Sequence, residues 1–318
     1  MIEKNTVFIL GAGASVTYGY PTGFQLSQEI KVSLQNINTR LPEIQEGLLP
    51  MFNKLGYDIK ELTEFYKCFL GAATDSVDKF LENRPDFEML GKLLIAYFLK
   101  RKENSHQLFI GLQESNWYAL LFNKLDITVD NIKNYNISFI TFNYDRSLEF
   151  FLNSFLKNRT TKNSEFVFEV MECFPIVHVY GSLGNLPWKD ANGIEYDYHV
   201  DHSQLKRMAG GIDIMSSERD SSQLKRAYEL LFNASYIYFI GFGYDETNLR
   251  RLKIQDCMKD KTIKGTSVGI QESRRSEIFN FFDLGLRDIY KGTSGPCIRL
   301  ADEKTDIIEF LNSYVFFQ

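Results

Sequence analysis

The chain has 318 residues, an apolar share of 44%, an aromatic share of 14% and a formal net charge of −5. This length provides a buried core for one large domain or two unequal ones. The net negative charge is not that of a dedicated nucleic-acid binder, which carries an excess of basic residues. No apolar stretch approaches the roughly 20 residues of a membrane-spanning helix. We therefore expect neither nucleic acid nor a membrane as a direct partner.

The cysteines are scattered through the chain, and none belongs to a Cys-x-x-Cys pair: they are Cys68, Cys173, Cys257 and Cys297. This usage is typical of free thiols in a reducing compartment, and the spacing offers no zinc site. The first residues lack the layout of a signal peptide. We therefore expect a cytoplasmic protein that binds no metal.

In chain order, an apolar run at 7–10 predicts a first strand, followed by a glycine turn, a helix from about 14 and another over 24–34. Residues 40–130 repeat apolar side chains at helical spacing, which predicts inserted helices. From residue 136 onward, strands and helices alternate. We expect strands at 137–141, 166–170, 176–179, 237–240, 267–270 and 297–300, and helices at 147–156, from about 245, at 272–282 and at 306–316.

This alternation predicts an α/β fold, a Rossmann-like doubly wound parallel sheet with a helical insertion. We assign residues 1–38 and 131–318 to a Rossmann-like, nucleotide-binding domain and residues 39–130 to an inserted helical module. The polar stretch at 184–222 is punctuated by glycine and proline, and we expect a loop or lid there.

Four short motifs each follow one of the apolar runs. In a parallel sheet the carboxyl ends of the strands lie along one edge, where ligands bind. We therefore expect the motifs to converge on a single nucleotide pocket. They are Gly11-Ala12-Gly13-Ala14-Ser15, Thr141-Phe142-Asn143-Tyr144-Asp145, His178-Val179-Tyr180-Gly181-Ser182 and Gly241-Phe242-Gly243-Tyr244-Asp245.

Glycine pairs mark the first and fourth motifs, and they let the backbone approach a phosphate or ribose closely. Val16 occupies the position where the dehydrogenase fingerprint needs glycine or alanine, and no acidic ribose ligand follows, so an oxidoreductase is disfavoured. A P-loop is excluded because Gly-Lys-Ser/Thr does not occur. For each glycine pair, a tight turn without a ligand is the alternative interpretation.

Polar side chains mark the second and third motifs. We expect Asn143 to hold a water or a ribose hydroxyl at the reacting carbon and Asp145 to steady the loop; alternatively, Asp145 caps the following helix and Asn143 satisfies a turn. His178 and Tyr180 share one face of their strand. His178 is the candidate general base, with a hydrogen-bonded core histidine as the alternative.

With these motifs in family order, the chain resembles the sirtuin-like superfamily, and more narrowly the bacterial sirtuin-like NAD-hydrolysing effectors of antiphage defence. The first motif with Pro21 is similar to the family's first NAD loop, and the second resembles its catalytic asparagine motif. The resemblance implies catalytic roles for Asn143, His178, Asp145 and Tyr180. It implies NAD contacts at Gly11, Ala12, Gly13, Ser15, Pro21, Thr141, Gly181, Ser182, Gly241, Gly243 and Asp245.

Two features depart from the family pattern. The family histidine directly precedes the glycine, where this chain has Tyr180, so we expect His178 to act as base and Tyr180 to relay the proton. Deacylating sirtuins carry a four-cysteine zinc module, which nothing here matches. Protein deacylation is therefore the least favoured of the functions that the family implies.

The resemblance implies hydrolysis of the bond between nicotinamide and ribose in NAD+, giving nicotinamide and ADP-ribose, by an effector of abortive infection. NAD is the substrate, and no metal is required. Control is expected from homo-oligomer assembly or from a partner chain, such as a HerA-type ATPase or another sensor. The alternative function is a non-catalytic sensor that binds NAD or ADP-ribose through the same loops.

Overall fold

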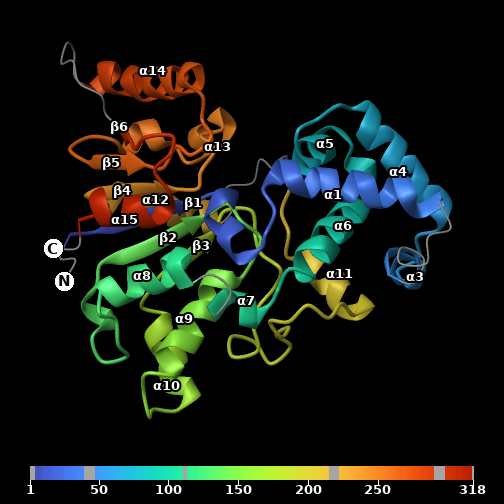
Figure 1. Ribbon diagram of the computed structural model, residues 1–318, viewed down its shortest axis with the longest axis horizontal. Helices are drawn as coiled ribbons and strands as arrows, with labels where there is room; N and C mark the ends of the chain where they lie inside the picture. The colour runs from blue at the N-terminus through green and yellow to red at the C-terminus, as the bar shows by residue number, and fades with distance from the viewer. Residues whose placement is uncertain (1–3, 39–46, 110–112, 215–221, 290–297, 317–318) are drawn as a thin grey trace.

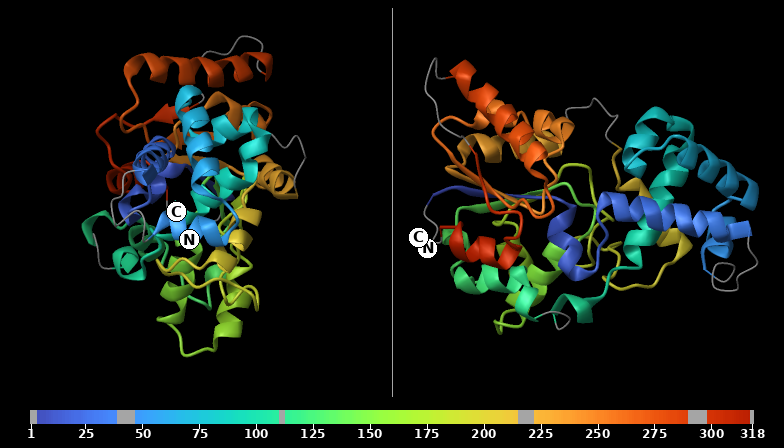
Figure 2. Two further views of the ribbon diagram at one scale, coloured as in Figure 1. Left: turned by 90° about the vertical axis from the view of Figure 1, so that its right-hand side faces the viewer. Right: turned by 45° about the horizontal axis from the view of Figure 1, so that its top comes forward.

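The computed structural model describes residues 4–38, 47–109, 113–214, 222–289 and 298–316 (Figure 1). Predictions that fall on residues 39–46 and 215–221 and on Cys297 lie outside these ranges. Within them, the chain forms one parallel sheet with helices on both faces, and a second, helical lobe stands beside it (Figures 1 and 2).

The sheet confirms the predicted α/β architecture. Its strand order is β3-β2-β1-β4-β5-β6, and every neighbouring pair is parallel. The strands are β1 (Thr6–Leu10), β2 (Ile137–Thr141), β3 (Ile176–His178), β4 (Tyr236–Ile240), β5 (Thr262–Gly265) and β6 (Ile298–Leu300).

The central strands are apolar because helices cover the sheet on both sides. All five residues of β1 are buried. Phe8 pairs in register with Phe139 and Tyr238, and its ring stacks on theirs at centroid distances of 5.4 and 5.3 Å. This aromatic row fixes the register of three strands, and with it the positions of the loops that follow them.

Helices from successive crossovers cover the two faces (Figures 1 and 2). One face carries α8 (Trp117–Lys124), α9 (Ser147–Lys157), α10 (Ser164–Met171) and α15 (Ile307–Ser313), with the short α7 (Ser105–Phe109) packed against α9. The other face carries α12 (Ser222–Asn233), α13 (Glu246–Arg251) and α14 (Glu272–Ile289). No helix in the described ranges has both the length and the apolar character that a membrane crossing requires.

The helical lobe packs around α6, most of whose residues are buried. Its members are α1 (Gly23–Gln35), α3 (Leu48–Lys54), α4 (Ile59–Gly71), α5 (Val77–Asn83), α6 (Glu88–Lys100) and α11 (His202–Gly210). Capping boxes at Thr22 and Asp58 satisfy the free N–H groups that begin α1 and α4. The lobe therefore draws residues from both predicted sequence ranges.

Three local predictions are wrong. Residues 166–170 lie in helix α10, because the Asn163 side chain caps its first turn and Val167, Val170 and Met171 face inward at helical spacing. Residues 267–270 form a turn, closed by an Ile270 N–H bond to the Ser267 carbonyl, and the strand lies earlier, at β5. Part of the predicted loop at 184–222 is helix α11.

Candidate functional site at the carboxyl edge of the sheet

The last residues of four neighbouring strands stand in one row. Leu10 pairs with Thr141 on one side and with Ile240 on the other, and Thr141 pairs with His178. The strand order reverses between β1 and β4, the place where open parallel sheets bind ligands. The four motifs therefore begin side by side, as the sequence predicts.

Asn143 joins the second motif to the first. Its Nδ2 donates to the Gly11 carbonyl and to Ser15 Oγ, both at 3.0 Å, and its backbone N–H donates to Thr141 Oγ1 at 3.0 Å. These bonds assign the orientation of the amide group. Its Oδ1 has no donor among the described residues, so the side chain is locked with an acceptor to spare.

Asp145 connects this loop to the first motif and to the start of α9, whose N-cap residue is Arg146 and has no side-chain cap. It accepts hydrogen bonds from Ser15 Oγ at 2.8 Å, from the Ser147 N–H at 3.1 Å and from the Ser147 hydroxyl. Ser147 lies in the first turn of α9. Burial raises the pKa of the Asp145 carboxyl above its ordinary value, although the two serines oppose this shift.

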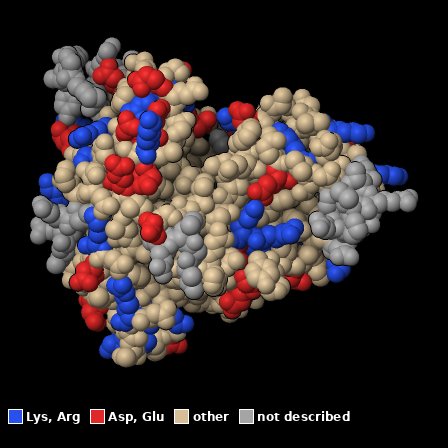
Figure 3. All heavy atoms as spheres, in the orientation of Figure 1, with Lys and Arg blue, Asp and Glu red and all other residues tan. Residues whose placement is uncertain are grey.

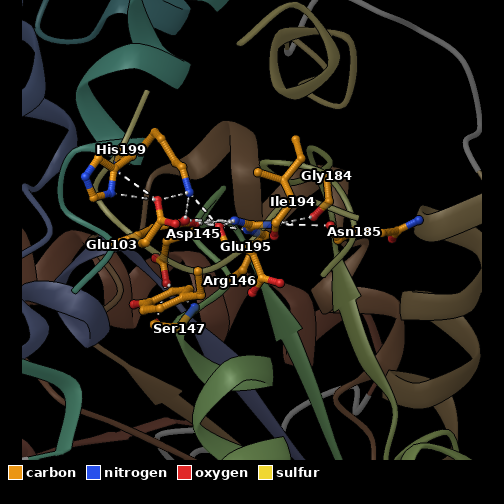
Figure 4. A network of polar contacts seen from close by, with 12 residues as sticks. Glu103, Asp145, Arg146, Ser147, Gly184, Asn185, Ile194, Glu195 and His199 are labelled. Carbon is orange, nitrogen blue, oxygen red and sulfur yellow. Dashed lines mark hydrogen bonds and ion pairs between the residues drawn. The ribbon is translucent and has the colours of Figure 1, made fainter. Parts of the chain in front are cut away.

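Arg146 anchors a buried ion network beside Asp145 (Figure 4). Its guanidinium pairs with Glu103 through contacts of 2.7 to 2.9 Å, and Lys100 Nζ lies 2.8 Å from the same carboxylate. Arg146 and Glu103 have side chains that are 1% and 0% exposed. Burial raises the pKa of Glu103, against the effect of both cations.

The same cations hold the loop that precedes α11. Arg146 donates to the Ile194 carbonyl at 2.9 Å and to the Asn185 carbonyl at 3.2 Å, and Lys100 donates to the Glu195 carbonyl at 2.6 Å. Tyr196 in this loop stacks on the Phe150 ring at 4.3 Å. The described part of the predicted lid is thus tied down at several points.

His178 lies next to Asn143, but both of its ring nitrogens are engaged. Nδ1 bonds to the Asn143 carbonyl at 2.8 Å, and Nε2 lies 2.5 Å from Glu149 Oε1. Burial lowers the pKa of His178, but the Glu149 charge and the hydrogen bonds outweigh it and hold the pKa above its ordinary value. With both nitrogens engaged, the geometry favours a cationic imidazole that holds Asn143 in position. It does not favour a neutral imidazole that is free to accept a proton.

Glu149 completes this pair from the first turn of α9. Burial raises its pKa, but the His178 charge reverses the shift and holds the pKa below its ordinary value. Oε2 of Glu149 is buried and has no hydrogen-bond partner in the described part of the chain. The carboxylate is therefore tied to the histidine through one oxygen only.

Tyr180 stands where the resemblance places the family histidine. Its hydroxyl donates to Asn248 Oδ1, and its ring lies 5.5 Å from that of Phe142 and 5.2 Å from the Arg251 guanidinium. Burial raises the pKa of Tyr180 to about 12, against the effect of Arg251. The phenol is a donor at neutral pH and is not placed to act as a base.

The glycines of the first and fourth motifs pack against each other. The Gly13 N–H donates to the Gly241 carbonyl at 2.9 Å, and a Cβ on Gly241 would lie 2.0 Å from the Ala14 nitrogen. Gly241 also has a φ of +57°, a backbone region that favours glycine. Gly243 differs from these residues because a Cβ there would meet only open space.

Two cavities open at this edge, where the sequence predicts one pocket. The first, which we call the glycine cavity, has a volume of about 560 Å³ and is lined by Ala12, Gly13, Gly241 and Gly243 together with apolar side chains such as Val268 and Ile307. The second, about 550 Å³, is lined by His178, Glu149, Gly181, Ser182 and Trp188 among others. Asn143 lines neither cavity. Its side-chain amide does bond to Gly11, the residue directly before Ala12, which lines the glycine cavity.

The remaining predicted residues serve the surrounding loops. Pro21 lies just before α1 and lines a separate surface hollow, which shares Val16 with the glycine cavity. Gly181 forms a bridge to Ile212, and the Ser182 N–H donates to the Gly211 carbonyl at 3.0 Å. Asp245 caps α13 through the Asn248 N–H, as its position before a helix predicts.

Sequence reasoning missed the charged partners of this site. Glu149 could have been noticed, since it falls on the helix that follows Asp145 and one turn beyond it. Glu103 and Lys100 gave no comparable signal, because they belong to the helical insertion and reach Arg146 only through the tertiary fold.

Neither a scan against protein-family models nor a search of curated proteins finds a match for this chain.

Among the described residues, no group of three His, Cys, Asp or Glu side chains is placed to hold a metal ion. Basic and acidic side chains are intermingled on the face shown in Figure 3. The geometry of the carboxyl edge is therefore the basis for any functional assignment.

Proposed function

We propose that this chain binds NAD+ at the carboxyl edge of its sheet and hydrolyses the nicotinamide–ribose bond. The observation that carries this proposal is the anchoring of Asn143 Nδ2 to Gly11 and Ser15, which leaves Oδ1 as a fixed acceptor. The glycine cavity beside it supports a place for the ADP half of the dinucleotide, with backbone at Ala12 and Gly13 and apolar walls for the base.

The reaction requires little acid–base catalysis by the protein, because nicotinamide leaves as a neutral base. The C1′–N bond breaks, its electron pair stays on the departing neutral nicotinamide, and the ribose carries the developing positive charge. A water attacks C1′ and loses its proton to solvent, giving ADP-ribose. Asn143 Oδ1 would accept a hydrogen bond from that water or from a ribose hydroxyl, and orientation of this kind supplies several kcal/mol of a barrier.

The test measures NAD+ loss and nicotinamide release by the wild type and by Asn143→Ala and Asn143→Asp. We expect a loss of about 100-fold or more in kcat for both variants, the scale of a misplaced reacting group. The assay is run with the chain alone and with a HerA-type ATPase, because the resemblance implies an effector held inactive until it assembles. Equal turnover by wild type and Asn143→Ala would reject the proposal.

A second candidate function is a nucleotide sensor that binds NAD+ or ADP-ribose without cleaving it. The engagement of both His178 nitrogens and the placement of Tyr180 favour it, because neither of the two residues that the sequence suggests as base or relay is placed to accept a proton. Calorimetric binding of NAD+ with no nicotinamide release, alone or with the ATPase, would select the sensor.

A further inference from the structure

Two consecutive residues of helix α5, Asp78 and Lys79, contact two of the motif loops. Asp78 Oδ1 accepts a hydrogen bond of 2.6 Å from the Tyr144 hydroxyl, in the loop after β2. Lys79 Nζ lies 3.4 Å from Asp245 Oδ2, in the loop after β4. Figure 1 shows α5 in the helical lobe, so the two contacts reach from that lobe to the carboxyl edge of the sheet.

The two contacts differ in strength. The side chains of Lys79 and Asp245 are 45% and 35% exposed, and an ion pair in such a setting contributes little. Tyr144 is a buried residue, and its phenol donates to a carboxylate, which makes a strong hydrogen bond. Burial raises the pKa of Asp78 above its ordinary value, against the effect of the Tyr144 bond. The Asp78–Tyr144 contact is therefore the stronger of the two links.

Tyr144 also contacts the loop after β3 and the Asp213 carbonyl. Its carbonyl accepts a hydrogen bond of 2.9 Å from the Leu183 N–H, in the loop after β3. Its hydroxyl lies 3.4 Å from the Asp213 carbonyl. The residue directly before it is Asn143, so a displacement of Tyr144 is transmitted through one peptide bond to the anchored amide.

We propose that Tyr144 and Asp78 are positioning residues through which the helical lobe fixes Asn143 against the first glycine loop. This inference rests on the proposed NAD+ hydrolysis for its catalytic consequence. It assigns the insertion a role in the site itself, since the insertion supplies the acceptor that orients the loop after β2. Neither residue needs to touch the substrate.

The test compares Tyr144→Phe, Asp78→Ala and Asp78→Asn in NAD+ turnover. Tyr144→Phe and Asp78→Ala should each lower kcat by about tenfold, the effect of losing one hydrogen bond to a charged group, and the double variant should be no worse than either. KM should change by less than about twofold, because the loss concerns orientation and not binding. Asp78→Asn keeps an acceptor oxygen for the phenol and should restore most of the rate.

The matched control is Tyr135→Phe, which removes another buried phenol, one that donates to the Leu125 carbonyl away from the sheet edge. A kcat of Tyr144→Phe equal to that of wild type, or a loss that Tyr135→Phe reproduces, would overturn the inference. So would additive losses in the Tyr144→Phe, Asp78→Ala double variant.

Amide hydrogen exchange separates this inference from the proposed function. The Asp78–Tyr144 contact should protect residues 142–146, so Tyr144→Phe should speed exchange there while Tyr135→Phe leaves it unchanged. If the wild type cleaves no NAD+, the proposed hydrolysis fails, yet faster exchange in Tyr144→Phe still supports the positioning role. Unchanged exchange at 142–146 contradicts that role whatever the turnover shows.

Discussion

The Ser15 hydroxyl donates a hydrogen bond of 2.8 Å to the Asp145 carboxylate, joining two motifs that lie 130 residues apart in the chain. The same oxygen accepts the second Nδ2 hydrogen of Asn143. Ser15 thus fixes the orientation of Asn143 and partly satisfies the buried Asp145. One small side chain connects the loop after β1 to the loop after β2.

Ser15→Ala should therefore affect both stability and function. It removes one of the hydrogen bonds that Asp145 accepts and one acceptor of Asn143 Nδ2. We expect the free energy of unfolding, measured with urea, to fall by about 1–3 kcal/mol, the cost of an unsatisfied buried polar group. NAD+ turnover should fall as well, because the Asn143 amide is then held by the Gly11 carbonyl alone.

Ser27→Ala is the matched control, since Ser27 is buried and donates only to the Gly23 carbonyl one turn earlier in its own helix. It should change the free energy of unfolding by less than about 1 kcal/mol and leave turnover unchanged. A Ser15→Ala variant that behaves like this control would show that the two motifs are not energetically linked.

The two glycines of the fourth motif should respond differently to substitution. Gly241→Ala places a Cβ 2.0 Å from the Ala14 nitrogen in a left-handed conformation, so the protein should lose stability and NAD+ affinity together. Gly243→Leu meets open space, yet its side chain enters the glycine cavity. It should weaken NAD+ binding by about tenfold or more at an unchanged melting temperature, as expected for a blocked subsite.

Differential scanning calorimetry gives the melting temperatures and titration calorimetry gives the NAD+ affinities. Tight NAD+ binding by Gly243→Leu would place the dinucleotide outside the glycine cavity. A Gly241→Ala variant as stable as wild type would contradict the close packing of the two glycine loops.

Most of the fold was predictable because the strands of a doubly covered parallel sheet are short apolar runs that end in glycine or polar residues. The segment at 166–170 was not, because Phe166, Val167, Phe168 and Val170 suit a strand as well as a buried helix. The decisive signal was local, namely Asn163 as a helix cap. The strand β5 was missed because Lys264 interrupts its apolar pattern.

The convergence of the motif loops at one edge of the sheet was predictable, but their charge pairing and their division between two cavities were not. Strand ends place Asn143 and His178 side by side from topology alone. The partners of His178 and Arg146 depend on how α9 and α6 pack, which no local pattern encodes. For that reason, the sequence suggested a histidine free to act as base, whereas the structure engages both of its nitrogens.

The His178–Glu149 pair should make stability depend on pH. The pKa of His178 is raised, so its contribution is complete below the ordinary value of 6.5 and is lost as pH rises through the folded value. The pKa of Glu149 is lowered, so its contribution is complete above 4.5 and is lost as pH falls through the folded value. The pair is therefore worth most between these two ordinary values.

Glu149→Gln removes the pair, and the loss in unfolding free energy relative to wild type should be largest between pH 4.5 and 6.5. It should reach about 1–3 kcal/mol there and shrink as pH rises past the pKa of His178. Urea unfolding across this range gives the difference. A loss that stays constant from pH 5 to pH 9 would mean that His178 is neutral in the folded protein.

Arg146 should be among the most sensitive positions in the chain. Arg146→Met leaves the buried Glu103 carboxylate with Lys100 alone and frees the carbonyls of Asn185 and Ile194. Because removal of one partner from a buried ion pair leaves an uncompensated charge, we expect a loss of about 3–5 kcal/mol in the free energy of unfolding. Arg226→Met is the control, since the ion pair of Arg226 with Glu229 is exposed and its loss should cost no more than about 1 kcal/mol.

Arg146→Lys should recover only part of the loss, because an ammonium cannot bridge a carboxylate and several carbonyls at once. Equal stability of Arg146→Met and Arg226→Met in urea would contradict the network, and full recovery by lysine would mean that charge alone, without the planar fork of the guanidinium, holds the loop at 184–197.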